Sequence, residues 1–108
     1  MTFDAFKSEI ITNVRKFFPN VRSTITEKRG IILEARVDIS ENAFLEIYHN
    51  ALTGKKSYAL ITNGKRILGY DNYKHWHLHP LDNPARHIPC SEPSMEEVFS
   101  EMKDILSD

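Results

Sequence analysis

The spacing of apolar residues changes at Val21 from three or four positions to two, and this change constrains the fold more than any other feature. Before it, apolar residues recur as they do on one face of a helix, at Phe3, Phe6, Ile10, Val14 and Phe17. We expect a helix that is capped by Thr2 and ends before Pro19. After Val21 the apolar residues alternate, which is typical of strands with one buried face.

The alternation continues over several segments up to about residue 73, and turn-forming residues separate these segments. The clearest segment is 31–40, where one face carries Ile31, Leu33, Ala35, Val37 and Ile39. Turns are predicted at Arg29-Gly30, at 52–55 and at Asn63-Gly64. Short turns between successive strands indicate an antiparallel meander of four to five strands.

A second amphipathic segment follows a proline-containing loop. Ser94 and Glu97 form the Ser-x-x-Glu pattern of a capping box. The apolar residues after Ser94 recur at helical spacing, at Met95, Val98, Phe99, Met102, Ile105 and Leu106. A chain of 108 residues is long enough for one core. We therefore expect one α+β domain over residues 1–108, an antiparallel β-meander flanked by an N-terminal and a C-terminal helix.

Composition and apolar patterning exclude several classes of protein. The chain is 41% hydrophobic and 27% charged, which is typical of soluble globular proteins. Its apolar runs are far shorter than the roughly 20 residues of a membrane span, and its first residues lack the apolar run of a secretory signal. The single cysteine, Cys90, allows no internal disulfide. We expect a cytoplasmic protein that does not bind membranes.

Charge is unevenly distributed although the formal net charge is −1. Residues 55–89 carry six lysines and arginines against two acids, whereas residues 90–108 carry one lysine against six acids. The basic region also holds four of the five histidines. Positive potential beside imidazoles suits a ligand that carries phosphate, so RNA is a candidate substrate or partner.

The stretch HWHLHP places His75, His77 and His79 at alternate positions. On an extended segment these rings share one face, so we expect Trp76 and Leu78 to anchor the segment in the core and the histidines to point outward. Two neighbouring rings can close on one zinc ion, but all three cannot do so on a straight strand. A metal site would need a further ligand from among His87, His49, Asp71 and Glu46, and we expect no cofactor.

Three functions remain open for this cluster. Two histidines can act on RNA as base and acid, one taking the 2′-hydroxyl proton while the other protonates the departing 5′-oxygen, without a metal. Lys74 or Arg86 would hold the phosphate, and Asp71 would fix the tautomer of one ring. The alternatives are a non-catalytic binding module that uses the basic, histidine-rich face, and a metal-dependent hydrolase.

The second half of the chain resembles a known family. It contains a strand ending in GYDN, histidines shortly after it, a proline-bearing loop, RHIP and the closing segment PSMEEVFSEMKDIL. This order is similar to that of the small prokaryotic family that includes the TumE-type toxins, which are encoded beside helix-turn-helix antitoxins. The resemblance extends from about Tyr58 to Ile105. It implies the toxin of a type II toxin–antitoxin pair, with a helix-turn-helix antitoxin as its partner.

The resemblance also implies site residues. The positions that match the family pattern are Asp71, Asn72, His75 and His87, with Tyr58 and Glu46 as further members. His77 and His79 stand outside that pattern as local additions. The leading hypothesis is metal-independent RNA cleavage with His75 and His87 as the acid–base pair and Asp71 orienting one of them. Substrate binding is assigned to Asn72, Lys74, Arg86, Tyr58 and Glu46, and a homodimer remains open.

Overall fold

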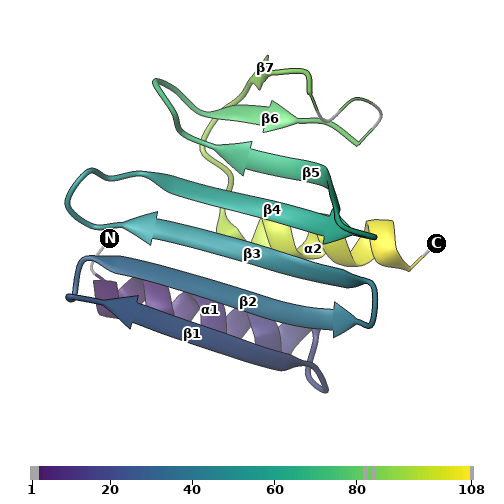
Figure 1. The fold of residues 1–108 in the computed structure, drawn as a ribbon, viewed down its shortest axis with the longest axis horizontal. Coiled ribbons are helices and arrows are strands. Elements are labelled where there is room, and N and C mark those ends of the chain that lie inside the picture. The colour runs from purple at the N-terminus through teal and green to yellow at the C-terminus, as the bar shows by residue number, and fades with distance from the viewer. Residues whose placement is uncertain (1–2, 82, 84, 108) are drawn as a thin grey trace.

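The fold is one antiparallel sheet with two helices on the same face (Figure 1), and the computed structural model describes residues 3–81, 83 and 85–107. The strands follow one another across the sheet in chain order. They are β1 (Arg22–Lys28), β2 (Ile32–Ser40), β3 (Ala43–Asn50), β4 (Lys56–Thr62), β5 (Lys65–Asp71), β6 (His77–His79) and β7 (Ile88–Pro89). The helices are α1 (Phe3–Phe17), before the sheet, and α2 (Met95–Leu106), after it. Both lie behind the sheet in Figure 1, and we call the opposite side of the sheet the uncovered face.

The α+β class and the two flanking helices are confirmed, but the predicted number of strands is wrong. Over the described residues the sheet has seven strands instead of four to five. The two strands beyond β5 have three and two residues, too few to show a period. They form because β6 pairs with β5 and β7 pairs with β6, within a stretch rich in proline. The cap predicted at Thr2 lies outside the described residues.

The hairpin turns form where the sequence predicts them. Arg29 and Gly30 connect β1 to β2 with φ angles of 57° and 66°. Asn63 and Gly64 connect β4 to β5 with φ angles of 51° and 78°. Positive φ at both central residues is the requirement of the tight turns that match the twist of paired strands, and Asn-Gly meets it with little strain.

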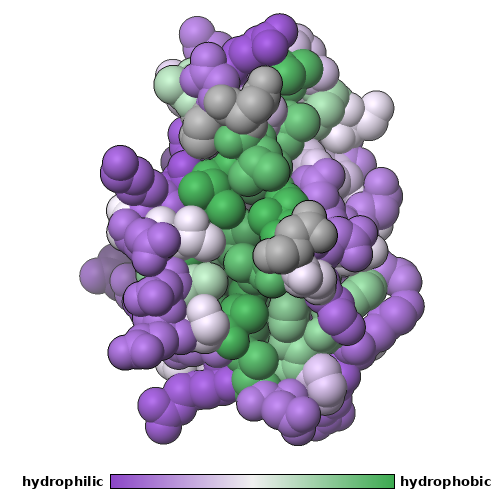
Figure 2. All heavy atoms as spheres, turned by 90° about the vertical axis from the view of Figure 1, so that its right-hand side faces the viewer, coloured by the Kyte–Doolittle hydropathy of each residue, from purple (hydrophilic) through white to green (hydrophobic). Residues whose placement is uncertain are grey.

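The core lies between the sheet and the helices. Strands β2 and β3 bury every second side chain, and α1 and α2 pack on that face with their apolar stripes. Figure 2 shows hydrophobic residues gathered in one band with polar residues on both sides, as expected where the interior between two layers reaches the edge. Neither described helix is long and apolar enough to cross a membrane.

The capping box at the start of α2 is present in full. The backbone N–H of Glu97 donates to Oγ of Ser94 at 3.1 Å, and the backbone N–H of Ser94 donates to Oε1 of Glu97 at 3.2 Å. Replacing Ser94 with alanine is expected to lower the free energy of unfolding by about 1 kcal/mol, measured by urea denaturation. The control Ser100→Ala lies inside the same helix and should cause no loss. Equal stability of parent and Ser94→Ala would contradict this prediction.

His49 lies apart from the other histidines, on the helix-covered face of the sheet. It is buried and stacks on Phe6 with ring centroids 4.6 Å apart. Among the described residues, neither ring nitrogen has a hydrogen-bond partner. Burial, and then the charge of Lys56, lower the pKa of His49 below its ordinary value of 6.5, against a smaller raising effect of the backbone at Lys55. His49 therefore cannot serve as a ligand with the other histidines, because the sheet separates them.

The lowered pKa predicts how stability depends on pH. Since the folded state holds the proton on His49 more weakly than the unfolded state, this residue costs stability as pH falls below about 6.5. His49→Phe removes the titrating group and keeps a ring against Phe6. The stability of the variant relative to the parent should rise on acidification, by at most about 1.4 kcal/mol per pH unit. Urea denaturation at several pH values measures this, and a constant difference between the two proteins would contradict it.

Candidate functional site

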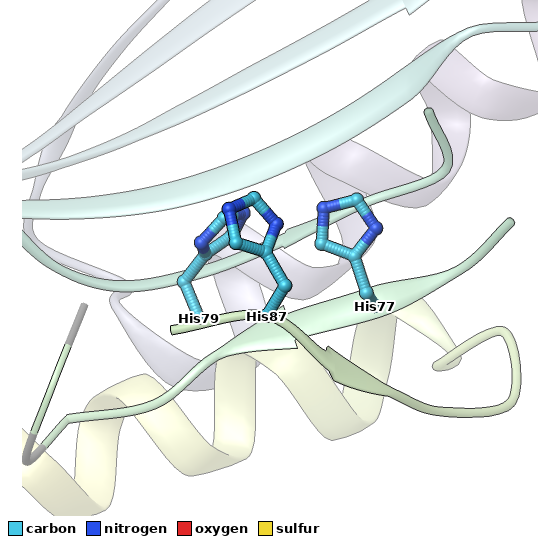
Figure 3. Close-up of side chains that lie close together, drawn as sticks. All are labelled: His77, His79 and His87. Atoms are coloured by element: carbon cyan, nitrogen blue, oxygen red, sulfur yellow. The ribbon is translucent and has the colours of Figure 1, made fainter. Parts of the chain in front are cut away.

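Pairing of β5, β6 and β7 brings an aspartate and three histidines together on the uncovered face. In the register of β5 and β6, Asp71 lies opposite His77 and Gly69 lies opposite His79. Because alternate residues of a strand share a face, these side chains lie on one side of the sheet. His87 directly precedes β7, which pairs with β6. Figure 3 shows the rings of His77, His79 and His87 projecting to the same side of β6.

Asp71 is the hydrogen-bond centre of this group. Nε2 of His79 donates to Oδ2 of Asp71 at 3.1 Å, and Nε2 of His77 lies 3.0 Å from Oδ1 of the same carboxylate. The backbone N–H of Tyr73 also donates to Oδ1. Burial alone would raise the pKa of Asp71, but the hydrogen bonds from Tyr73 and His79 and the charges of both rings outweigh it, so this pKa lies below its ordinary value of 3.8. The carboxylate is therefore ionised at neutral pH.

The two bonded histidines are buried, which corrects the expectation that the histidines of HWHLHP point outward. The exposed fraction is 5% for His77 and 3% for His79. Their rings do lie on the face opposite Trp76 and Leu78, which pack against the core as predicted. Of the three histidines in this stretch, only His75 is exposed. The expectation fails because the ring of His87, which precedes β7, packs against the rings of both residues.

The surroundings of each buried ring determine where its protons lie. Nδ1 of His77 is 3.1 Å from the carbonyl oxygen of His75, while Nε2 faces the carboxylate. A carbonyl oxygen can only accept, so Nδ1 of His77 carries a proton and donates it there. Nδ1 of His79 is 3.2 Å from Nη2 of Arg66, which is a donor, so His79 accepts there and carries its proton on Nε2. Nδ1 of His77 is thus a donor, whereas Nδ1 of His79 is an acceptor.

Arg66 and Gly69 belong to the site although the sequence did not single them out. A Cβ atom at position 69 would lie 3.1 Å from Cδ of Arg66. The absence of a side chain at Gly69 therefore leaves the space through which Arg66 reaches His79. One feature of the sequence could have indicated Arg66. It follows the Asn63-Gly64 turn, at the start of the strand that precedes the histidine-bearing segment.

A cleft of about 550 Å³ opens beside this cluster on the uncovered face. Its basic residues are Lys55 and Arg66, and Tyr73, which is 65% exposed, lies at its surface. The residues that line it come from β4, β5, β6 and the segments beside them. They are Lys55, Ser57, Tyr58, Ala59, Arg66, Gly69, Tyr70, Asp71, Tyr73, His77, His79, Ala85 and His87.

The two histidines predicted as the acid–base pair are both exposed, and both contact the buried His77. The ring centroid of His87 is 4.9 Å from that of His77 and 4.4 Å from that of His79. The ring centroid of His75 is 5.8 Å from that of His77. The rings that Asp71 holds are those of His77 and His79, so Asp71 can influence the exposed pair only through a buried ring.

The basic and amide residues predicted for substrate binding are chain neighbours of residues that line the cleft. Asn72 connects the end of β5 to the turn before β4, since its Oδ1 accepts from the backbone N–H of Lys56 at 2.8 Å and its Nδ2 donates to the carbonyl of Gly54 at 2.9 Å. Lys74 and Arg86 are exposed and lie in the segments that precede β6 and β7. Neither is among the residues that line the cleft.

Tyr58 and Glu46 are separated from the histidine rings. Tyr58 pairs with Tyr70 in the register of β4 and β5, and the residue after Tyr58 pairs with Gly69. Successive residues of a strand point to opposite faces, so the side chain of Tyr58 points to the helix-covered face, where it stacks on Trp76. Burial, and then the charges of Glu9 and Glu92, raise its pKa. Glu46 is on the uncovered face, but three strand spacings, roughly 14 Å, separate it from β6.

The structure also bears on nucleophilic catalysis by a thiol and on metal binding. Burial raises the pKa of the Cys90 thiol, which is the opposite of what an activated nucleophile requires. His77, His79 and His87 each offer a ring nitrogen, and these nitrogens lie within 4.8 Å of one another, so the three rings could hold a metal ion.

Comparison with known proteins adds one result. The model of the family described as Toxin TumE matches residues 8–106, which include every strand, α2 and the whole histidine cluster. No curated protein and no solved structure matches the chain. The family match covers nearly the whole sequence and agrees with the resemblance found in its second half. The chain belongs to the TumE toxin family.

Proposed function

We propose that this protein is the toxin of a type II toxin–antitoxin pair and that it cleaves RNA by acid–base catalysis without a metal. Family membership supports the toxin part of the proposal. The observation that carries the reaction is the position of exposed His87 against two buried rings, both in contact with Asp71, in a cleft that also contains Lys55 and Arg66. This arrangement offers proton-transfer groups beside positive charge, which RNA cleavage requires.

The proposed reaction uses the 2′-hydroxyl of RNA as the nucleophile. His87 takes the proton of that hydroxyl, and the oxygen forms a bond to the adjacent phosphorus. His75 gives a proton to the 5′-oxygen as its bond to phosphorus breaks. The products are a 2′,3′-cyclic phosphate and a free 5′-hydroxyl. His87 and His75 are the catalytic residues in this proposal, since they contact the reacting atoms.

Charges around the cleft favour the transition state of this reaction. The guanidinium of Arg66 lies beside the cleft and would stabilise the extra negative charge on the phosphate. Lys55 would bind the phosphate in the ground state, and Lys74 and Arg86 would bind neighbouring phosphates from the segments on either side. Asp71 acts through His77, so it is a positioning residue.

The proposal includes a partner and a compartment. A toxin of this kind is kept inactive by a cognate antitoxin, and we propose one of the helix-turn-helix type encoded beside this gene. RNA substrates and a single unpaired cysteine both fit the cytoplasm. Co-expression of the neighbouring reading frame should restore growth to cells that express the toxin, and failure to restore it would remove that frame as the antitoxin.

Growth of cells that express the protein is the first test. Wild type should arrest growth, and the His75→Ala/His87→Ala double variant should not, with folding of both checked by circular dichroism. Both rings are exposed, so the double variant should fold. Full arrest by the double variant would reject histidine catalysis and would favour the binding module, which needs no proton transfer.

Purified protein allows a sharper test of the chemistry. With EDTA present, wild type should cleave RNA and leave 2′,3′-cyclic phosphate and 5′-hydroxyl ends. The matched control is the same oligonucleotide with a single 2′-deoxy sugar at the cleavage position, which should resist cleavage because it lacks the nucleophile. Cleavage of the deoxy substrate at the same bond would exclude the proposed reaction.

A further inference from the structure

Three rings on the uncovered face are close enough to share one metal ion. One ring nitrogen from each of His77, His79 and His87 lies within 4.8 Å of the other two (Figure 3). Two rings come from alternate positions of β6 and the third precedes β7, which is paired with β6. On a straight strand only two neighbouring histidines can close on one metal ion, so a further ligand is needed. His87 lies where it can supply that ligand.

The three ring nitrogens need to move only a little to reach the spacing of metal ligands. Zn–N bonds of about 2.0–2.1 Å in tetrahedral geometry require ligand nitrogens roughly 3.3 Å apart. His77 and His79 are buried and hydrogen-bonded, whereas His87 is exposed. Side-chain rotation, mainly that of His87, can therefore close the ligand set while the sheet stays in place.

The surroundings of the rings suit a metal ion. Nδ1 of His77 faces the carbonyl of His75 at 3.1 Å, an arrangement that places a proton on Nδ1 and leaves Nε2 to bind a metal. Nε2 of His77 and of His79 lie 3.0 and 3.1 Å from the carboxylate of Asp71. A cation that replaces the protons between these atoms stays beside a negative charge, and Asp71 can supply an oxygen as fourth ligand.

We propose that His77, His79 and His87 bind one divalent transition-metal ion with the preferences of Zn²⁺, and that the bound ion inhibits the toxin. Neutral imidazole is a preferred ligand of such ions. The inhibitory part rests on the proposed function, because coordination occupies the lone pair with which His87 would take the substrate proton. The ion is thus an inhibitor of this site and not its cofactor.

Arg66 opposes metal binding in this arrangement. Its Nη2 donates to Nδ1 of His79, which keeps the ring proton on Nε2, the nitrogen that faces Asp71. Coordination through Nε2 requires that this proton be lost, that Nδ1 take one up and that the guanidinium turn away. Arg66→Gln should therefore bind Zn²⁺ several-fold more tightly than the parent. Unchanged or weaker affinity would contradict coordination through Nε2 of His79.

The test uses the full chain without a histidine tag, freed of metal, and Zn²⁺ alone as the probe. Titration in competition with a coloured chelator should show one tightly bound equivalent. His87→Ala should weaken binding by at least roughly 100-fold, because loss of a ligand costs more than loss of an outer partner. His75→Ala is the matched control, since it removes a neighbouring exposed ring outside the ligand set and should leave the affinity unchanged. Substitution by Co²⁺ should give the visible absorption of tetrahedral coordination in the parent and not in His87→Ala.

Failure of this inference can be separated from failure of the proposed function. Absence of stoichiometric binding, or equal affinity of parent and His87→Ala, would overturn the metal site even if RNA is cleaved in EDTA. Zinc binding with no RNA cleavage under any condition would overturn the proposed function and leave the site standing. Cleavage that requires Zn²⁺ would overturn the inhibitory role and would favour the metal-dependent hydrolase.

Discussion

Replacement of His87 by alanine is expected to abolish growth arrest and to reduce RNA cleavage by about 10²- to 10⁴-fold, the usual contribution of a positioned acid or base. His87 is exposed at the cleft and contacts both buried rings, so its loss removes the proposed base without opening the core. The free energy of unfolding should change by no more than about 0.5 kcal/mol. Initial rates on a defined oligonucleotide in EDTA provide the measurement.

The control for this variant is Asn83→Ala. Asn83 is an exposed residue in the same segment and does not line the cleft. It should retain parental activity and stability. Retention of parental activity by His87→Ala would show that another group takes the substrate proton, and the proposed reaction would be wrong. Loss of activity in both variants would indicate that the segment itself, and not the imidazole, is needed.

Replacement of Asp71 by asparagine is expected to have the largest effect on stability among the site variants. The carboxylate accepts hydrogen bonds from His79 and from the backbone N–H of Tyr73, and Nε2 of His77 lies 3.0 Å from it. An amide has one oxygen for these donors, and its NH₂ group faces one of them. At least one of these donors then loses its acceptor beside two buried rings, so the free energy of unfolding should fall by about 1–3 kcal/mol.

Activity of the Asp71→Asn protein should fall as well, because the side chain at position 71 no longer holds both rings that His87 contacts. Asp38→Asn is the matched control: Asp38 pairs with Arg36 at 2.7 Å on the exposed part of the same face. That change should cost at most about 1 kcal/mol, the upper end for an exposed ion pair. Urea denaturation of the three proteins gives the comparison, and equal losses in both variants would contradict a special role for Asp71.

The elements that carry a long periodic pattern were predictable. The helical stripe from Phe3 to Phe17 and the alternation in segment 31–40 became α1 and β2. The capping box at Ser94 and the Asn63-Gly64 turn formed at the predicted positions. Each of these signals lies within a few residues of chain, so it can be read without knowing what packs against it.

The composition of the site was only partly predictable. The sequence indicated Asp71 and His87, and the structure brings them to the same cleft. It did not indicate that Asp71 bonds His77 and His79, the two rings that stood outside the family pattern. Arg66 escaped notice because its contact with His79 depends on space left by Gly69 on the adjacent stretch of β5.

The sequence by itself determined the two helices, a meander of four to five strands, three of its turns and the region that contains the histidines. Only the tertiary structure decided which rings are buried, which carboxylate they bond and which three nitrogens converge. The physical reason is that β6 and β7 are too short to have a pattern of their own and exist only as additions to β5. Their pairing places His87 over His77 and His79, and no local feature of the chain records that contact.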